Sequence, residues 1–303
     1  MSLLGNKLLI IGGTGFIGSY LCEEGLKKGM HVTSLSINSK GTNKNINYIN
    51  ADITNSLNLI DKLSKLNFDY VINCGGYIKH NPYFHGGNLV IKEHLIGLYN
   101  IIDSLDLSSL KRFIQIGSSD EYGLISAPQK EDDLCFPTSS YSYSKLSATN
   151  LLQSLGKYEN FKSTIVRIFL VYGPKQKENR LLPYIIKNFL NRKRINLSPG
   201  KQIRDFCFIS DIVNGIFKCI ETNKDIDGEV FNLSSADPIT VKELVSKVAN
   251  LTNTELPKFG NLDYKVNESM ELWGSNDKAR KILNWTPKVS IDEGLQKTID
   301  SYK

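Results

Sequence analysis

Tyr141 and Lys145 are the two side chains of this sequence whose types and spacing most directly favour acid–base chemistry. They stand four residues apart in Tyr141-Ser142-Tyr143-Ser144-Lys145, at the start of a stretch with helical leucine spacing. On a helix, residues four apart share one face, with Cβ atoms about 5–6 Å apart. A free tyrosine has a pKa of about 10, and a neighbouring ammonium brings that pKa towards the working range. The same spacing is also typical of a plain surface pair.

A run of glycines near the start of the chain favours the binding of a dinucleotide. The short apolar run 7–11 precedes Gly12-Gly13-Thr14-Gly15-Phe16-Ile17-Gly18, and a helical pattern follows it. Glycines suit a tight turn that a pyrophosphate can approach, and the amides that begin the next helix favour its negative charge. A purely structural turn is the alternative, but the order of strand, turn and helix favours the dinucleotide.

The end of the next predicted strand, residues 31–36, indicates which dinucleotide binds. An Asp or Glu there would hydrogen-bond the ribose hydroxyls of NAD and repel a 2′-phosphate. This chain has Ser36 at that place, followed by Asn38 and Lys40. Because no carboxylate is present and Lys40 can pair with a phosphate, we expect NADP(H) to be favoured over NAD(H). The alternative is NAD(H), with Lys40 as an ordinary loop lysine.

The elements that must position these residues alternate along the first part of the chain. Apolar strand patterns at 31–36, 46–50, 70–74, 112–116 and 163–169 are separated by helical stretches. This alternation predicts an α/β fold, with a Rossmann doubly wound parallel sheet whose ligands lie at the carboxyl ends of the strands.

The pattern changes after residue 172, where helices dominate. We expect an NADP(H)-binding Rossmann domain over residues 1–172, to which a strand near 229–234 returns. A smaller, mainly helical substrate domain is expected over residues 173–303.

Composition excludes several other classes of protein. With 303 residues, 41% hydrophobic and 22% charged, the chain is ordinary for a globular protein with a sizeable core. The formal charge of +6 comes from scattered lysines, and no apolar run approaches the roughly 20 residues that span a bilayer, so we expect neither nucleic acid nor a membrane as partner. The cysteines and histidines lack zinc or disulfide spacing, and we expect no metal. The start of the chain lacks a secretory pattern, which favours a cytoplasmic protein.

A serine-rich motif follows the strand predicted at 112–116. Gly117-Ser118-Ser119-Asp120-Glu121-Tyr122-Gly123 offers hydroxyls that can polarise a carbonyl. The order of glycine turn, serine after the fifth strand and Tyr-x-x-x-Lys resembles the extended short-chain dehydrogenase/reductase family, in its nucleotide-sugar branch of the NAD-dependent epimerase/dehydratase type. The resemblance extends to 167–174, 200–206 and 283–287, and so covers nearly the whole chain.

The resemblance implies a role for each matched residue. Tyr141 would be the acid–base group, Lys145 its partner and ribose ligand, and Ser118 the hydroxyl that orients the substrate oxygen. With the turn and strand-end residues above, the expected cofactor contacts are Gly12, Thr14, Gly15, Phe16, Ile17, Gly18, Ser36, Asn38, Lys40, Asp52, Ile53, Cys74, Gly75, Gly76, Tyr141 and Lys145. The expected contacts to a nucleotide-sugar substrate are Ser119, Asp120, Leu182 and Arg204, the last on its diphosphate.

The reaction itself is harder to predict, because reductases, epimerases and dehydratases of this family share hydride transfer at carbon 4 of the sugar. The motif 117–123 resembles that of 4-keto-6-deoxyhexose reductases such as CDP-abequose synthase-like proteins, and Ser36 favours a dissociating NADPH. We therefore expect NADPH-dependent reduction of the 4-keto group of a nucleotide-linked 6-deoxy- or 3,6-dideoxyhexose, in surface-polysaccharide sugar biosynthesis. The alternatives are an NAD-dependent nucleotide-sugar 4-epimerase or 4,6-dehydratase and, more remotely, a non-catalytic cofactor-sensing or scaffolding protein.

Some positions depart from the family's pattern. The 4,6-dehydratases commonly carry Asp and Glu where this chain has Ser119 and Asp120, and relatives often carry Asn in place of His94. The family often dimerises through the helix after the fourth strand and the helix that carries the tyrosine, so we expect a homodimer. Leu95, Leu98 and Ile102 on the first helix, and Leu151, Leu152 and Leu155 on the second, suit that interface or, equally, contact with the sheet.

Overall fold

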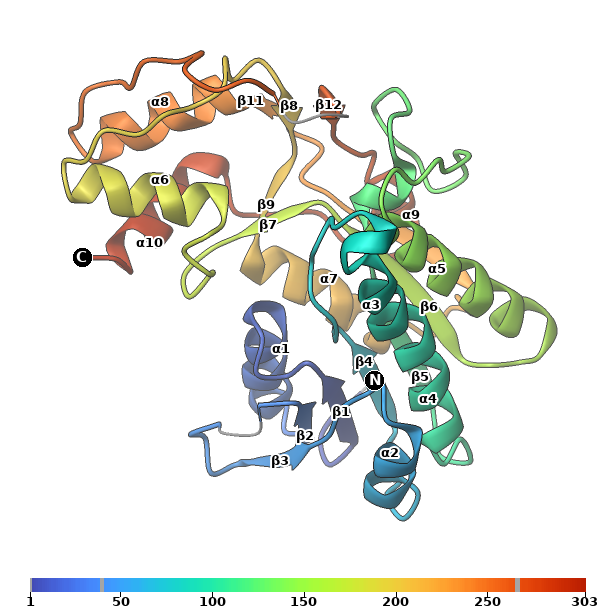
Figure 1. Ribbon diagram of the computed structural model, residues 1–303. Helices are drawn as coiled ribbons and strands as arrows, with labels where there is room; N and C mark the ends of the chain where they lie inside the picture. The colour runs from blue at the N-terminus through green and yellow to red at the C-terminus, as the bar shows by residue number, and fades with distance from the viewer. Residues whose placement is uncertain (1, 39–40, 265–267) are drawn as a thin grey trace.

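A seven-stranded parallel sheet forms the centre of the molecule in the computed structural model, which describes residues 2–38, 41–264 and 268–303 (Figure 1). Its strands run in the order β10-β6-β5-β4-β1-β2-β3, and every neighbouring pair is parallel. The strands are β1 (Lys7–Ile11), β2 (His31–Ser36), β3 (Ile46–Asn50), β4 (Tyr70–Asn73), β5 (Arg112–Ser118), β6 (Ser163–Ile168) and β10 (Glu229–Leu233). The predicted α/β fold with a parallel Rossmann sheet is confirmed.

Helices cover both faces of the sheet, because successive side chains of a strand point to opposite sides. In β1, Leu8 and Ile10 belong to one hydrophobic core, whereas Leu9 and Ile11 belong to the other. The first core is covered by α1 (Phe16–Lys27) and α7 (Ile209–Glu221), and the second by α2 (Ser56–Leu63), α4 (Gly97–Ser104) and α5 (Ser140–Tyr158). Burial on both faces explains why β1 is a continuous apolar run after Lys7.

The helical stretch predicted after β4 is interrupted in the structure. A 3₁₀ turn, η1 (Tyr83–His85), leads into α3 (Gly87–Ile91), then a π-helical turn, η2 (Lys92–Ile96), and then α4. His94 is buried within the π turn, and its Nε2 lies 3.0 Å from the carbonyl oxygen of Tyr77. Such π turns are frequent at functional sites.

The rest of the chain builds a smaller, mainly helical region next to the sheet (Figure 1). Trp285 donates a hydrogen bond to the carbonyl of Asp211 in α7, and the Asp211 carboxylate accepts from the amides of Lys288 and Val289. This region and one face of the sheet therefore share a core. Its elements are β7 (Leu170–Tyr172), α6 (Leu181–Leu190), β8 (Ile203–Arg204), β9 (Phe206–Phe208), β11 (Ile239–Thr240), α8 (Val241–Leu251), β12 (Glu271–Leu272), α9 (Asp277–Leu283) and α10 (Ile291–Asp300).

Two leucines considered for a dimer interface lie in the interior instead. Leu98 and Leu152 have no exposed surface and pack in the second core, so they contact the sheet. All five cysteines are free thiols. Within the described ranges, no helix combines the length and apolar character needed to cross a membrane.

Candidate active site

A cavity of about 2110 Å³ lies at the carboxyl ends of the sheet strands. It extends from the glycine turn after β1, past β4 and β5, to β8 in the smaller region. Every sequence-predicted catalytic, cofactor and substrate residue lines it apart from Lys40, which lies outside the described residues. The parallel sheet therefore brings the predicted residues together in one space.

The glycine turn leaves no room for side chains. Gly12 has a φ of +79°, and a Cβ on Gly18 would lie 2.2 Å from the carbonyl oxygen of Gly12. Helix α1 begins after Gly15, and no side chain caps its first amides. A bare turn followed by uncapped helix amides fits a pyrophosphate. Gly12, Thr14, Gly15, Phe16, Ile17 and Gly18 all face the cavity.

The end of β2 uses Ser36 differently from the prediction. The Ser36 hydroxyl accepts a hydrogen bond from the amide of Thr14, at 3.3 Å, so it supports the glycine turn. Asn38 is exposed at the cavity edge, and no carboxylate occurs in the described residues 31–38. The Asp52 carboxylate accepts hydrogen bonds from the amide and hydroxyl of Thr54, and Ile53 packs against α4 beside it.

The loop after β4 brings three residues to the cavity wall. The Cys74 thiol donates a hydrogen bond to the carbonyl of Ile11, at 3.0 Å, which joins β4 to β1. Gly75 and Gly76 follow, and Gly76 has a φ of +94°. A Cβ on Gly76 would lie 2.3 Å from Cε1 of His94, so this glycine lets the imidazole approach the loop.

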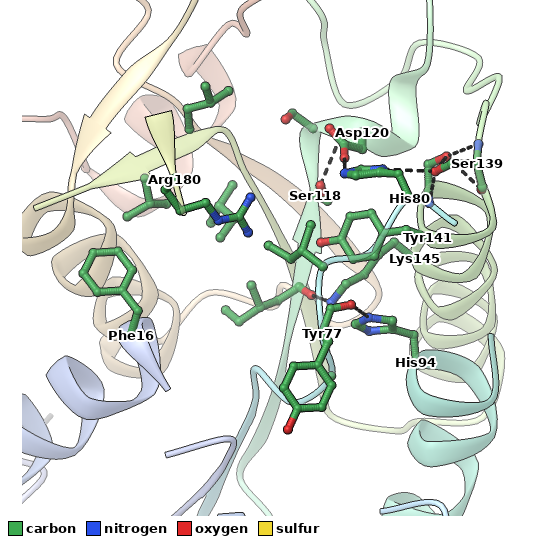
Figure 2. A pocket seen from close by; sticks show the side chains of 18 of the residues that line it. Phe16, Tyr77, His80, His94, Ser118, Asp120, Ser139, Tyr141, Lys145 and Arg180 are labelled. Carbon is green, nitrogen blue, oxygen red and sulfur yellow. Dashed lines mark hydrogen bonds and ion pairs between the residues drawn. The ribbon is translucent and has the colours of Figure 1, made fainter. Parts of the chain in front are cut away.

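Ser118, Tyr141 and Lys145 meet in the middle of the cavity (Figure 2). Ser118 ends β5 and caps the 3₁₀ turn η3 (Ser119–Tyr122), where its hydroxyl oxygen accepts a hydrogen bond from the Asp120 amide at 3.1 Å. Tyr141 and Lys145 lie on the first turns of α5. The Lys145 ammonium donates to the carbonyl of Ile116 at 2.8 Å and lies 5.9 Å from the centre of the Tyr141 ring.

The electrostatics of this trio are dominated by burial. Burial lowers the pKa of Lys145 to about 8, with the charge of Glu121 opposing the shift. Burial, and then the charge of Asp120, raise the pKa of Tyr141 well above its usual value, against the hydrogen bond with Ser118 and the charge of Arg180. The lowering that the sequence predicts from Lys145 is not among these main influences. Tyr141 therefore needs further positive charge near it to lose its proton readily.

Glu121, in the same motif, belongs to the framework and not to the cavity wall. Its carboxylate accepts hydrogen bonds from the Ser118 amide, the Thr149 hydroxyl and the Arg167 guanidinium, each at 2.8 Å. Glu121 and Arg167 are almost fully buried. This network fixes the end of β5 against α5 and β6, and so fixes the distance between Ser118 and Tyr141.

Two histidines that the sequence did not assign to the site flank the tyrosine. The rings of His80 and His94 lie edge-on to the Tyr141 ring, with centres 5.4 Å and 5.2 Å away. Burial and the charge of Lys145 lower the pKa of His94 to about 3, so its imidazole is neutral. Because the Tyr77 carbonyl can only accept, Nε2 of His94 carries the hydrogen. The sequence signal available for His94 was its departure from the family's Asn.

Asp120 and Ser119 differ in their exposure to the cavity. The Asp120 carboxylate faces the cavity 3.6 Å from Nε2 of His80, whereas Ser119 is buried at the cavity wall. Burial raises the pKa of Asp120, and the charges of His80, Arg180 and Arg204 oppose that shift. Asp120 therefore presents an acceptor to any ligand beside Tyr141.

Two arginines line the cavity beyond Tyr141. Arg204, in β8, is held by Glu268 and by its own donation to the carbonyl of Ile203, and Leu182 lies buried at the start of α6. Arg180 precedes α6 and points its guanidinium into the cavity (Figure 2). Among the described residues no carboxylate lies within 4.0 Å of it. Arg180 has no role predicted from sequence, although it stands two residues before Leu182, a predicted substrate contact.

Comparisons with known proteins match nearly the whole chain. The model of the NAD dependent epimerase/dehydratase family matches residues 8–234. A UDP-glucuronate 4-epimerase of Thermodesulfobacterium geofontis is 26% identical, over 96% of this chain and 94% of that protein. A human dTDP-D-glucose 4,6-dehydratase is 26% identical, over 98% of this chain and 90% of its own. The crystal structure of UDP-glucuronic acid 4-epimerase from Bacillus cereus, in complex with UDP-glucuronic acid and NAD, superposes with a TM-score of 0.88 at 28% identity, covering 97% of this chain and 98% of that one.

Proposed function

The chain belongs to the NAD dependent epimerase/dehydratase family, and on that premise we propose that it is an NAD-dependent 4-epimerase of a UDP-linked hexose or hexuronate. The observation that carries this proposal is the meeting of Ser118, Tyr141 and Lys145 midway along one cavity. The glycine turn lies at one end of that cavity and Arg204 at the other. The 4-epimerase relative and the structural neighbour with bound UDP-glucuronic acid and NAD support the choice of reaction.

The expectation of an NADPH-dependent 4-ketoreductase is wrong. The relatives are 4-epimerases and 4,6-dehydratases, and none of those compared above is a reductase of the CDP-abequose type. The error has a chemical reason, because all three reactions begin or end at the same carbon with the same tyrosine. The motif 117–123 and Ser36 therefore do not distinguish a reductase from an epimerase or a dehydratase.

The residues of the chain divide the work of epimerisation between them. When bound, an oxidised nicotinamide dinucleotide supplies a hydride acceptor for carbon 4 and a positive charge. Tyr141 takes the proton of the sugar 4-hydroxyl and later returns it. The Ser118 hydroxyl oxygen accepts from the Asp120 amide, and its proton, which is shared with Tyr141 in the absence of a ligand, can donate to the sugar oxygen once a substrate is bound. Lys145, held by the Ile116 carbonyl, keeps a cation near the phenol.

NAD is the cofactor we propose, as in the structural neighbour from Bacillus cereus that was crystallised with it. The preference for NADP(H) remains a prediction from the absence of a carboxylate after β2. Calorimetric titration of the protein with each dinucleotide decides between them. Tighter binding of NADP than of NAD contradicts the cofactor assignment.

Three further features are part of the proposal. We propose that residues 1–172, with β10, act as the cofactor domain and that 173–303 act as the substrate domain. We also propose a homodimer through the exposed residues Leu89, Ile96, Tyr99 and Tyr143 of the helices beside β4 and of α5. The cytoplasmic location stays a prediction.

Conversion of a sugar nucleotide at carbon 4 tests the function directly. The protein is incubated with NAD and UDP-glucuronate, UDP-glucose or UDP-N-acetylglucosamine, and products are identified by proton NMR. We expect the 4-epimer of at least one substrate without net consumption of cofactor. In Tyr141→Phe, turnover should fall by about 10²–10⁴-fold while NAD affinity stays within about threefold. Loss of water from the substrate would instead assign a dehydratase, and unchanged turnover in Tyr141→Phe contradicts the assigned acid–base group.

A further inference from the structure

Asp120 carries a negative charge near Tyr141, and the described residues of the site give its carboxylate no hydrogen bond. Asp120 and Glu121 are adjacent carboxylates, but three donors hold Glu121 in the framework. No hydrogen bond donor reaches the Asp120 carboxylate in the described part of the chain, and the charge of Asp120 acts on Tyr141. A negative charge at that place opposes the loss of the phenolic proton.

His80 is the basic group in contact with that carboxylate. It stands on the loop between β4 and η1, with Nε2 at 3.6 Å from Asp120 and Nδ1 at 3.5 Å from the hydroxyl of Ser139. Ser139 caps α5, the helix that carries Tyr141. His80 therefore touches the motif after β5, the start of the catalytic helix and the ring of Tyr141 at once (Figure 2).

We propose that His80 is a positioning residue that holds the carboxylate of Asp120 and balances its charge while Tyr141 exchanges a proton with the sugar. The proposal rests on the proposed 4-epimerase function. His80 acts through Asp120 and does not itself touch the reacting atoms. The pair of His80 and Asp120 therefore acts in addition to Ser118, Tyr141 and Lys145.

The other charged groups around Tyr141 do not replace His80. On η3, Glu121 is paired with Arg167, and on α5, Lys145 is held by a backbone carbonyl. On the π turn, His94 is neutral. Arg180 acts on Tyr141 as well as on Asp120, but it forms no ion pair with Asp120 among the described residues. Arg204 also acts on Asp120, but it is already paired with Glu268.

Two substitutions with opposite expected effects test the proposal. His80→Gln keeps a hydrogen-bond donor beside Asp120 but cannot carry a charge, so the ionisation midpoint of Tyr141 should rise by about 0.5–1 pH unit. Asp120→Asn removes the negative charge, so the midpoint should fall by a similar amount. The midpoint is followed with NAD bound, by NMR of protein labelled with carbon-13 at tyrosine Cζ. The Tyr141 resonance is identified by its absence in Tyr141→Phe.

The double variant separates a charge effect from a structural one. If His80 acts through Asp120, His80→Gln should shift the midpoint hardly at all when Asp120→Asn is already present. His85→Gln is the matched control, because His85 lies on η1 and does not line the cavity. It should leave the midpoint in place. A midpoint that does not move in His80→Gln, or moves equally in the Asp120→Asn background, overturns the proposal.

The pH profile of epimerisation gives a second readout. The acid limb of kcat/KM should move in the same directions, so that below the limb His80→Gln is about three- to tenfold slower than the wild type. If the wild type does not epimerise any sugar nucleotide, the proposed function fails, while the NMR midpoints still decide the role of His80. If it epimerises and the midpoints do not move, this inference alone fails.

Discussion

Lys145 is a buried cation whose only hydrogen bond within the described chain is to the carbonyl of Ile116. Burial lowers its pKa from 10.5 to about 8, which means that the folded protein binds the ammonium proton less tightly than the unfolded chain. The buried ammonium therefore destabilises the folded state below about pH 8, and this destabilisation is absent above about pH 10.5. This ammonium lies 5.9 Å from the centre of the Tyr141 ring, at the proposed active site.

The stability of the protein should carry a signature of this lysine. Between pH about 8 and about 10.5 the unfolded chain holds the Lys145 proton and the folded one does not, so stability rises with pH by about 3 kcal/mol across that window. Lys145→Met should lose this rise. Urea unfolding of both proteins at pH 7.5 to 10.5 measures the difference between them, in which other titrating groups cancel. A constant difference across the window contradicts the assigned pKa.

Arg180 predicts the kind of sugar that fits best. Its guanidinium enters the cavity without a carboxylate partner among the described residues, and the carboxylate of a hexuronate would supply one. In Arg180→Met, kcat/KM for UDP-glucuronate should fall by about 10–100-fold, and that for UDP-glucose by less than about threefold. Lys177→Met, another cation at the cavity wall, should not discriminate between the two sugars. Equal losses on both substrates contradict a carboxylate contact.

The residues that could be predicted are those tied to a short motif next to a strand or helix. Ser118 follows a strand, and Tyr141 and Lys145 follow a helix cap, so local sequence placed all three. His80 and Arg180 come from irregular segments, 77–82 and 173–180, whose paths depend on tertiary packing and leave no periodic signal. Ser36 was selected for the right place but for another role, since its hydroxyl binds the Thr14 amide.

Among the elements, the glycine turn makes the strictest demand on sequence. A Cβ at Gly18 would meet the backbone of Gly12 and Gly13 at 2.2–2.8 Å, where nothing can move aside cheaply. Gly18→Ala should weaken NAD binding by more than about tenfold and destabilise the fold by about 1–3 kcal/mol. Calorimetry and thermal unfolding measure both. Ser19→Ala, one residue on, adds no atom and serves as the control; wild-type affinity in Gly18→Ala contradicts the proposed pyrophosphate site.

The strands were predicted more accurately than the helical stretch beside them. β2 and β3 have the predicted bounds. One helical stretch was predicted from about Asn88 to Leu105, but a π turn, η2, divides it. That turn brings His94 against Gly76 and Tyr141, a tertiary arrangement that helical periodicity does not encode.

At the scale of the whole molecule, residues of both the sheet region and the smaller region line the cavity. NAD alone should slow amide exchange in 12–18 and 74–76, and addition of UDP should extend the protection to 197–204 of the smaller region. Hydrogen exchange followed by mass spectrometry measures this. Protection of 197–204 by NAD alone would contradict separate cofactor and nucleotide ends. UDP without NAD provides the reference for the order of binding.

The sequence alone did not predict the reaction correctly. Fold and site followed from patterns that one chain carries, such as the alternation of strands and helices. Epimerisation, reduction and dehydration differ in how the sugar turns or loses a group after the first step at carbon 4.

The position of β10 has a consequence for how the protein is made. β6 is complete once residue 168 has been synthesised, but its partner on the outer side is residues 229–233. Until then the nascent chain carries an open strand edge, which invites pairing with other chains. Asn232 of β10 also receives the hydroxyl of Tyr122 and binds the carbonyl of Gln129, so the motif after β5 is finished by the same late strand. About three quarters of the 303 residues must therefore be synthesised before the seventh strand completes the sheet and the catalytic framework can become rigid.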